Sequence, residues 1–139
     1  MHRRVFLIAL LAAPLLADSQ QQVFDLFTKI AAAMSNDDAL PFLDAVDREM
    51  PQYDVFQANV KALVDQADVT NSIEVLSNSG DDAHRSEELD WFMQIVGKSE
   101  DHPVERRREV VKVSLARRGK KWKIVSIDPI GFFAPPKQP

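Results

Sequence analysis

Three side chains in the second half of the chain are of types that could carry acid–base chemistry. A carboxylate can move a proton at neutral pH when burial or a neighbouring charge shifts its pKa. Glu109 and Arg107 alternate with the apolar Val111, so they share one strand face and can point toward the mouth of a cavity. Asp128 shares parity with Trp122 and can approach the same space. The competing interpretation is that Glu109 and Arg107 pair with charges on adjacent strands.

The most uneven charge distribution lies in residues 104–123, which hold 9 basic and 2 acidic side chains, whereas residues 18–103 hold 5 basic and 18 acidic ones. This basic segment could pair with the acidic strand around Glu87, Glu88 and Asp90. It could also dock an acidic partner or an anionic surface, or form a solvated edge that prevents strand-to-strand aggregation. A partner would contact the cations at its turn: Arg117, Arg118, Lys120 and Lys121. We expect no binding to nucleic acid, because the chain as a whole is acidic.

Motifs for metal, nucleotide and thiol chemistry are missing from the sequence. There is no cysteine, and His84 and His102 lie in polar turns without the spacing of metal ligands. There is no glycine-rich phosphate loop, so we expect neither a metal nor a cofactor. Trp91 and Trp122 could stack on a ligand, and packing in the core is the alternative for both.

The N-terminal segment, residues 1–17, has the pattern of a secretory signal. Arg3 and Arg4 precede an uncharged apolar run from Val5 to Ala17, which is too short to span a bilayer. We expect cleavage after Ala17, export to the periplasm or the medium, and contact with a membrane only through this segment. Its removal leaves 15 basic against 21 acidic side chains, a net charge of −6. An uncleaved N-terminal anchor is the alternative.

The rest of the chain changes from helical to strand periodicity. Apolar residues at three- and four-residue steps predict three helices within residues 19–67. Alternation over residues 69–133 predicts four antiparallel strands, with turns at 77–82 and around Gly119. We therefore predict one α+β domain over residues 18–133, in which the helices cover one face of a curved sheet, and a flexible tail over 134–139. Six aromatic residues are large enough to fill the seam: Phe24, Phe27, Phe42, Phe56, Trp91 and Trp122.

This order of elements, together with the run from Arg117 to Val125 containing Gly119-x-x-Trp122-x-Ile124, resembles the nuclear-transport-factor-2-like superfamily. The superfamily is also called SnoaL-like or cystatin-like. The resemblance covers about residues 20–130 and implies a cone of helices and bent sheet, with the concave space as the default ligand pocket. It also implies a possible homodimer through the sheet face. The superfamily contains isomerases, dehydratases and noncatalytic domains, so the fold alone does not give the function.

Two functions follow as hypotheses. The first is an exported, noncatalytic domain that binds a small apolar ligand or a protein partner. The second is a small isomerase or dehydratase that uses Glu109 or Asp128 as base and Tyr53 or Arg107 to polarise a carbonyl oxygen. The first is preferred, because no catalytic constellation stands out in the sequence.

Overall fold

The computed structural model describes residues 2–137, with side chains from residue 18 onward. The predicted signal segment 1–17 lies outside the residues whose side chains are described. The elements in chain order are α1 (His2–Ser35), α2 (Leu40–Ala45), α3 (Tyr53–Gln66), β1 (Ala67–Gly80), β2 (His84–Gly97), β3 (Val104–Arg118), β4 (Lys121–Asp128) and the 3-10 helix η1 (Ile130–Phe133). Within this part of the chain, no helix combines the length and the apolar character needed to cross a membrane.

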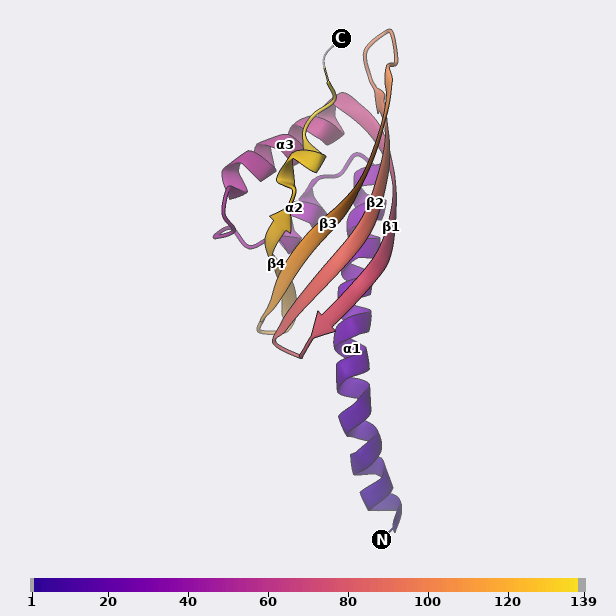
Figure 1. Cartoon of the computed structure of the whole chain (residues 1–139), viewed down its shortest axis with the longest axis vertical. Coiled ribbons are helices and arrows are strands. Elements are labelled where there is room, and N and C mark those ends of the chain that lie inside the picture. Colours follow the sequence, from indigo (N-terminus) through magenta and orange to yellow (C-terminus); the bar gives the residue numbers. More distant parts are fainter. Residues whose placement is uncertain (1, 138–139) are drawn as a thin grey trace.

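The four strands form one antiparallel sheet in the order β1-β2-β3-β4, which curls without closing into a barrel (Figure 1). Along β2, Leu89, Trp91, Met93 and Ile95 are at most 1% exposed, whereas the residues between them are half-buried. The two-residue period of a strand places these four side chains on the face that the helices cover. The α+β fold predicted from the sequence is confirmed.

Aromatic rings fill the space between the helices and the sheet. Phe42 of α2 lies 5.1 Å from Phe56 of α3 and 5.9 Å from Trp91 of β2, measured between ring centroids. Phe27 of α1 meets the edge of Trp91 at 6.4 Å. Phe133 of η1 completes the cluster at 5.0 Å from Trp91. The predicted aromatic seam is confirmed for all of its members except Phe24.

Phe24 was expected in the core but is 50% exposed. The buried stripe of α1 consists of Val23, Phe27, Ile30 and Met34. Because each residue turns the helix by about 100°, Phe24 lies about 60° away from Phe27 and leaves the stripe. It borders a shallow recess of about 200 Å³ between α1 and β1, together with Phe27, Thr28, Ala31, Ile73 and Val75.

A bulge in the pairing of β3 with β4 corrects the prediction for Asp128. The register shifts between Ser114 and Leu115, and the buried residues on β4 accordingly step from Ile124 to Ile127. An extra residue in one strand reverses the parity of everything that follows it. Asp128 is therefore exposed opposite Lys112, and does not share the buried face of β4.

The two outer hairpins differ in how well the sequence located them. The turn at Gly119 lies where it was predicted, between Arg118 and Lys121. The β1–β2 turn is shorter than the predicted one, because β1 continues to Gly80. Gly80 has φ of 131°, and a Cβ there would lie 2.2 Å from the carbonyl oxygen of His84, so the turn requires glycine.

Candidate binding groove

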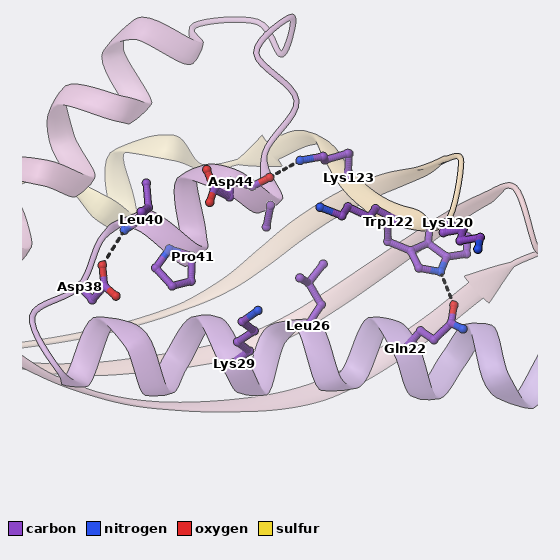
Figure 2. Close-up of a pocket in the computed structure, with 12 residues that line it drawn as sticks. Gln22, Leu26, Lys29, Asp38, Leu40, Pro41, Asp44, Lys120, Trp122 and Lys123 are labelled. Atoms are coloured by element: carbon purple, nitrogen blue, oxygen red, sulfur yellow. Dashed lines mark hydrogen bonds between the residues drawn. The ribbon is translucent and has the colours of Figure 1, made fainter.

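A groove of about 790 Å³ lies where α1, α2 and the β3–β4 hairpin meet (Figure 2). Side chains from all three elements converge on it, with Leu26 and Lys29 pointing from α1 toward the hairpin. Its apolar lining is Leu26, Leu40, Pro41, Ala45 and Trp122. Its polar lining is Gln22, Lys29, Asp38, Asp44, Lys120, Lys121 and Lys123. Four lysines against two aspartates give the lining a net positive charge, and together with the apolar side chains this suits a ligand that has both apolar groups and negative charge.

Trp122 is 6% exposed and belongs to the core cluster, which is the packing alternative for this residue, and it forms one end of this groove. Its indole Nε1 donates a hydrogen bond to Gln22 Oε1 at 3.0 Å, and the guanidinium carbon of Arg117 lies 4.7 Å from the ring centroid. Arg117 also donates to the Asp82 carbonyl oxygen at 2.7 Å and to Ser19 Oγ at 3.2 Å. Arg117, one of the predicted partner-binding residues, therefore positions Trp122 and α1.

The lysines of the groove differ in whether their ammonium groups already have a partner. The ammonium groups of Lys29, Lys120 and Lys121 form no ion pair with the residues that the structure describes. Lys123 donates a hydrogen bond to the backbone carbonyl of Asp44. Lys120 and Lys121, two of the predicted partner-binding residues, thus stand beside the predicted ligand-binding Trp122 with their charges open to a ligand.

A second recess of about 350 Å³ adjoins the groove and shares Asp44 and Lys123 with it. It brings together Tyr53 and Arg118, which the sequence assigned to different roles. Arg118 Nε lies 3.4 Å from Asp47 Oδ2, in an exposed ion pair of the kind that stabilises weakly.

Arg107 and Glu109 line a separate cleft of about 560 Å³ along the first half of β3. As predicted, both side chains lie on the sheet face of Val111. Glu109 is exposed. The Arg107 guanidinium donates to backbone carbonyls of the C-terminal segment and to Glu105, whose pKa this hydrogen bond lowers. These contacts use the donors that the enzyme hypothesis assigns to a substrate carbonyl.

Trp91 lies inside the molecule rather than in a groove. It is 1% exposed, and its Nε1 donates to Asn71 Oδ1 at 3.0 Å. Its ring stacks on Phe42 at an interplanar angle of 26°. Core packing, the alternative interpretation for Trp91, is the arrangement that the structure shows.

The basic segment pairs in part with its acidic neighbour strand. Arg108 Nη2 lies 2.7 Å from Asp90 Oδ2, and this hydrogen bond lowers the pKa of Asp90. Glu88 lies directly opposite Lys112 in the β2–β3 register. The predicted pairing of the basic segment with the acidic strand is therefore present, and it lies on the outer face of the sheet.

Glu87 behaves differently: the sequence grouped it with Glu88 and Asp90 as a partner of the basic segment, whereas the structure buries it, a position that sequence reasoning missed. It is 2% exposed, and Oε2 has no hydrogen-bond partner among the described residues. Burial raises the pKa of Glu87 to about 7, against the opposing effect of the neighbouring Arg85. The signal was available, because Glu87 shares parity with Leu89 and Trp91 and must point inward with them.

The histidines show no sign of metal chemistry in their placement. His84 and His102 are exposed at opposite ends of β2, in or beside turns. Within the described part of the chain, no three His, Asp or Glu side chains converge as ligands of an ion. No residue set can therefore be assigned to a metal there.

No family model matches the sequence, and no curated protein matches it either. The fold, in contrast, is similar to several solved structures. A nuclear transport factor 2 (NTF2-like) superfamily protein from Salmonella enterica serovar Typhimurium is 10% identical, with a TM-score of 0.64 over 88% of this chain and 95% of that chain. A type 2 hexachlorocyclohexane dehydrochlorinase (LinA) is 10% identical, with a TM-score of 0.64 over 80% and 83%.

A conserved protein from Planctomyces limnophilus is 5% identical, with a TM-score of 0.67 over 80% of this chain and 94% of that chain. At such low identity these similarities concern the arrangement of helices and strands, not the chemistry. Each of these neighbours is matched over most of its length. The chain therefore has the nuclear-transport-factor-2-like fold.

Proposed function

We propose that this protein is an exported, noncatalytic binding domain that holds an acidic segment of a partner protein in the groove between α1, α2 and the β3–β4 hairpin. The observation that carries the proposal is a set of three exposed lysines, Lys29 on α1 and Lys120 and Lys121 on the hairpin, which line the groove without an ion pair to any described residue. Carboxylates of the partner would pair with the lysines, and its apolar side chains would pack on Leu26 and Leu40.

The charge distribution favours an acidic ligand in this groove although the whole protein is acidic. The chain outside the basic segment is strongly negative, so an acidic partner is repelled from most of the surface and attracted at the hairpin. Such an arrangement orients the encounter and makes binding weaken as salt screens the charges.

A titration with a fluorescein-labelled hexaglutamate peptide, followed by fluorescence anisotropy, tests this proposal. The triple variant Lys29→Gln, Lys120→Gln, Lys121→Gln should weaken binding about ten-fold at low salt, as expected from three exposed pairs of a few tenths to 1 kcal/mol each. The matched control Lys61→Gln, Lys112→Gln, Lys137→Gln changes the net charge equally at exposed positions outside the groove. Equal losses in both triples would show a general charge effect and contradict a groove site.

Export is the second part of the proposal. Ser19, two residues after the expected cleavage position, is 1% exposed and donates its hydroxyl to Asp82 Oδ1 at 2.8 Å. The chain that begins at Asp18 therefore keeps an anchor between α1 and the β1–β2 turn. The intact mass of the protein recovered from an exporting host should correspond to a chain that starts at Asp18. A mass that includes residues 1–17 would contradict cleavage.

The enzyme hypothesis has less support. Only one cleft holds both a candidate base and a candidate polarising group, and there Glu109 is exposed while the donors of Arg107 already bind backbone carbonyls. Tyr53 lines the recess beside Arg118, Glu109 and Arg107 line the cleft on β3, and Asp128 lies on the outer face opposite Lys112. An acid–base mechanism needs the base and the polarising group on the same substrate.

A further inference from the structure

The C-terminal segment from Ile130 to Lys137 bridges α3 and the first half of β3. β4 ends at Asp128, so this segment adds no strand to the sheet. What it contributes is side chains: Phe132 and Phe133 of η1 are 7% and 0% exposed. Through these two rings, the C-terminal segment inserts into the core.

Phe133 occupies a cage of aromatic rings from three different elements. Its ring centroid lies 5.2 Å from Phe42 of α2, 5.8 Å from Phe56 of α3 and 5.0 Å from Trp91 of β2, each at an interplanar angle of 77° or 78°. Edge-to-face contacts on three sides define a space that fits one planar ring. The three rings of the cage belong to elements that do not depend on the C-terminal segment for their hydrogen bonding.

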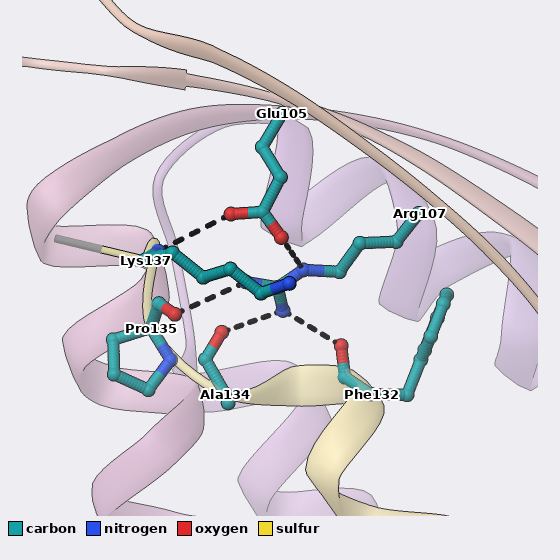
Figure 3. Close-up of polar contacts among 6 residues, drawn as sticks. All are labelled: Glu105, Arg107, Phe132, Ala134, Pro135 and Lys137. Carbon is teal, nitrogen blue, oxygen red and sulfur yellow. Dashed lines mark hydrogen bonds and ion pairs between the residues drawn. The ribbon is translucent and has the colours of Figure 1, made fainter. Parts of the chain in front are cut away.

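A single arginine holds the segment in place (Figure 3). Arg107 Nη1 donates to the carbonyl oxygens of Phe132 at 2.9 Å and Ala134 at 2.7 Å, and Nη2 donates to that of Pro135 at 3.0 Å. Glu105 fixes the arginine by accepting from its Nε. The Glu105 carboxylate also accepts the backbone N–H of Lys137 at 3.2 Å.

The arginine contacts lie outside the cage, at the surface of the cleft. The Arg107 side chain is 13% exposed, and the three carbonyls that it binds flank Phe133 in the sequence. The polar contacts are made by backbone carbonyls and the aromatic contacts by side chains, so a substitution of Arg107 removes the polar contacts and leaves every ring of the cage in the chain. This separation is what a latch requires.

We propose that Phe133 is an intramolecular occupant of a site for one aromatic ring and that Arg107 is the latch that keeps it there. When the latch opens, the cage accepts an uncharged, ring-bearing small molecule. The ligand must be uncharged because the cage offers the apolar faces of Phe42, Phe56 and Trp91, and a charge buried among them would lose its hydration without a partner. This site is separate from the lysine groove, and the proposal does not depend on the proposed function.

The test compares Arg107→Ala with Arg108→Ala in the full chain. Arg108 is the matched control, because it is the next residue on β3 and its guanidinium pairs with Asp90 on the outer face. Hydrogen exchange followed by mass spectrometry should show at least ten-fold faster exchange in residues 130–137 of the Arg107→Ala protein, with β2 unchanged. Toluene, an uncharged probe with one aromatic ring, should bind this variant with one-to-one stoichiometry in isothermal titration calorimetry, at least ten-fold more tightly than the parent or Arg108→Ala.

Phe133→Ala, which empties the cage and leaves Arg107 in place, should also bind one equivalent of the probe, and it serves if Arg107→Ala does not fold. Parent-like exchange and probe binding in the Arg107→Ala protein would overturn the latch. A uniform rise of exchange across β2 and α3 would overturn it as well, because Arg107 would then stabilise the whole fold. Failure of Phe133→Ala to bind the probe would overturn the ring site.

Discussion

Two cationic regions that both include residues of the β3–β4 hairpin have opposite uses. In the groove, Lys29, Lys120 and Lys121 are exposed and pair with none of the described acidic groups. In the cleft on β3, the chain's own carbonyls occupy the guanidinium of Arg107. A count of basic residues does not distinguish the two regions. What distinguishes them is whether the donors already have acceptors, which decides whether a cation can serve a ligand or serves the fold.

The largest effect is expected where the C-terminal segment enters the core. Phe133→Ala should lower the free energy of unfolding by about 3–5 kcal/mol, the usual cost of truncating a buried phenylalanine. Phe24→Ala, at a half-exposed position on α1, should cost less than about 1 kcal/mol. Urea denaturation of both variants measures the difference. Equal small losses would show that the segment is not part of the core, and the contrast between the two regions would fail.

The second effect depends on pH and concerns Glu87. The folded-state pKa of about 7 lies above the ordinary value of 4.5, so the folded protein binds the proton more tightly than the unfolded chain does. The cost of the buried charge is therefore absent below about pH 4.5, grows as the pH rises through this window, and is complete above about pH 7. Glu87→Gln should raise the free energy of unfolding by up to about 3 kcal/mol at pH 8, with no gain at pH 4.

Denaturation of the parent and Glu87→Gln proteins across that pH range measures the effect. Glu88→Gln is the control, because Glu88 is the next residue on β2 and faces the opposite side of the sheet. Parallel pH profiles for the parent and Glu87→Gln would contradict a raised pKa at Glu87.

The smallest effect compares two neighbouring arginines at the turn of the hairpin. Arg117→Ala removes the cation over Trp122 and the hydrogen bonds to Asp82 and Ser19, and should cost about 1–3 kcal/mol. Arg118→Ala removes one exposed pair with Asp47, and should cost less than about 1 kcal/mol. Thermal or urea unfolding gives both values. A larger loss for Arg118→Ala would contradict the conclusion that Arg117, and not Arg118, is the arginine at this turn that stabilises the fold.

Periodicity in the sequence predicted most of the fold, because burial follows the geometry of helices and strands directly. The alternation through Leu89, Trp91 and Met93 located β2 and its inner face, and Gly119 located the last turn. Asp128 was placed on the wrong face, because the bulge near Ser114 leaves no mark in the pattern of apolar residues. Phe24 was assigned to the core because it fits the three- and four-residue spacing of the apolar stripe, but it lies at the edge of that stripe and is half-exposed.

The candidate site was predictable only in part, for a related reason. The sequence showed that cations gather at 104–123 and that Trp122 follows them, but it gave no information on which acceptors each cation would meet. The contacts of Arg107 with carbonyls near residue 133 and of Arg117 with Ser19 join parts of the chain that are far apart in sequence. Such contacts depend on tertiary structure, and a single sequence carries no periodic signal for them.

The most direct test of the central claim is a ¹H–¹⁵N NMR titration of the protein with hexaglutamate, read at the two tryptophan indole N–H signals. Trp122 lines the groove, whereas the indole N–H of Trp91 is bonded to Asn71 inside the molecule. If the free lysines form the binding site, the Trp122 indole signal and the amides of residues 119–123 shift in a saturable way while the Trp91 signal stays in place. Shifts centred on residues 105–109 and the C-terminal segment, or no saturable shift at Trp122, would contradict the account.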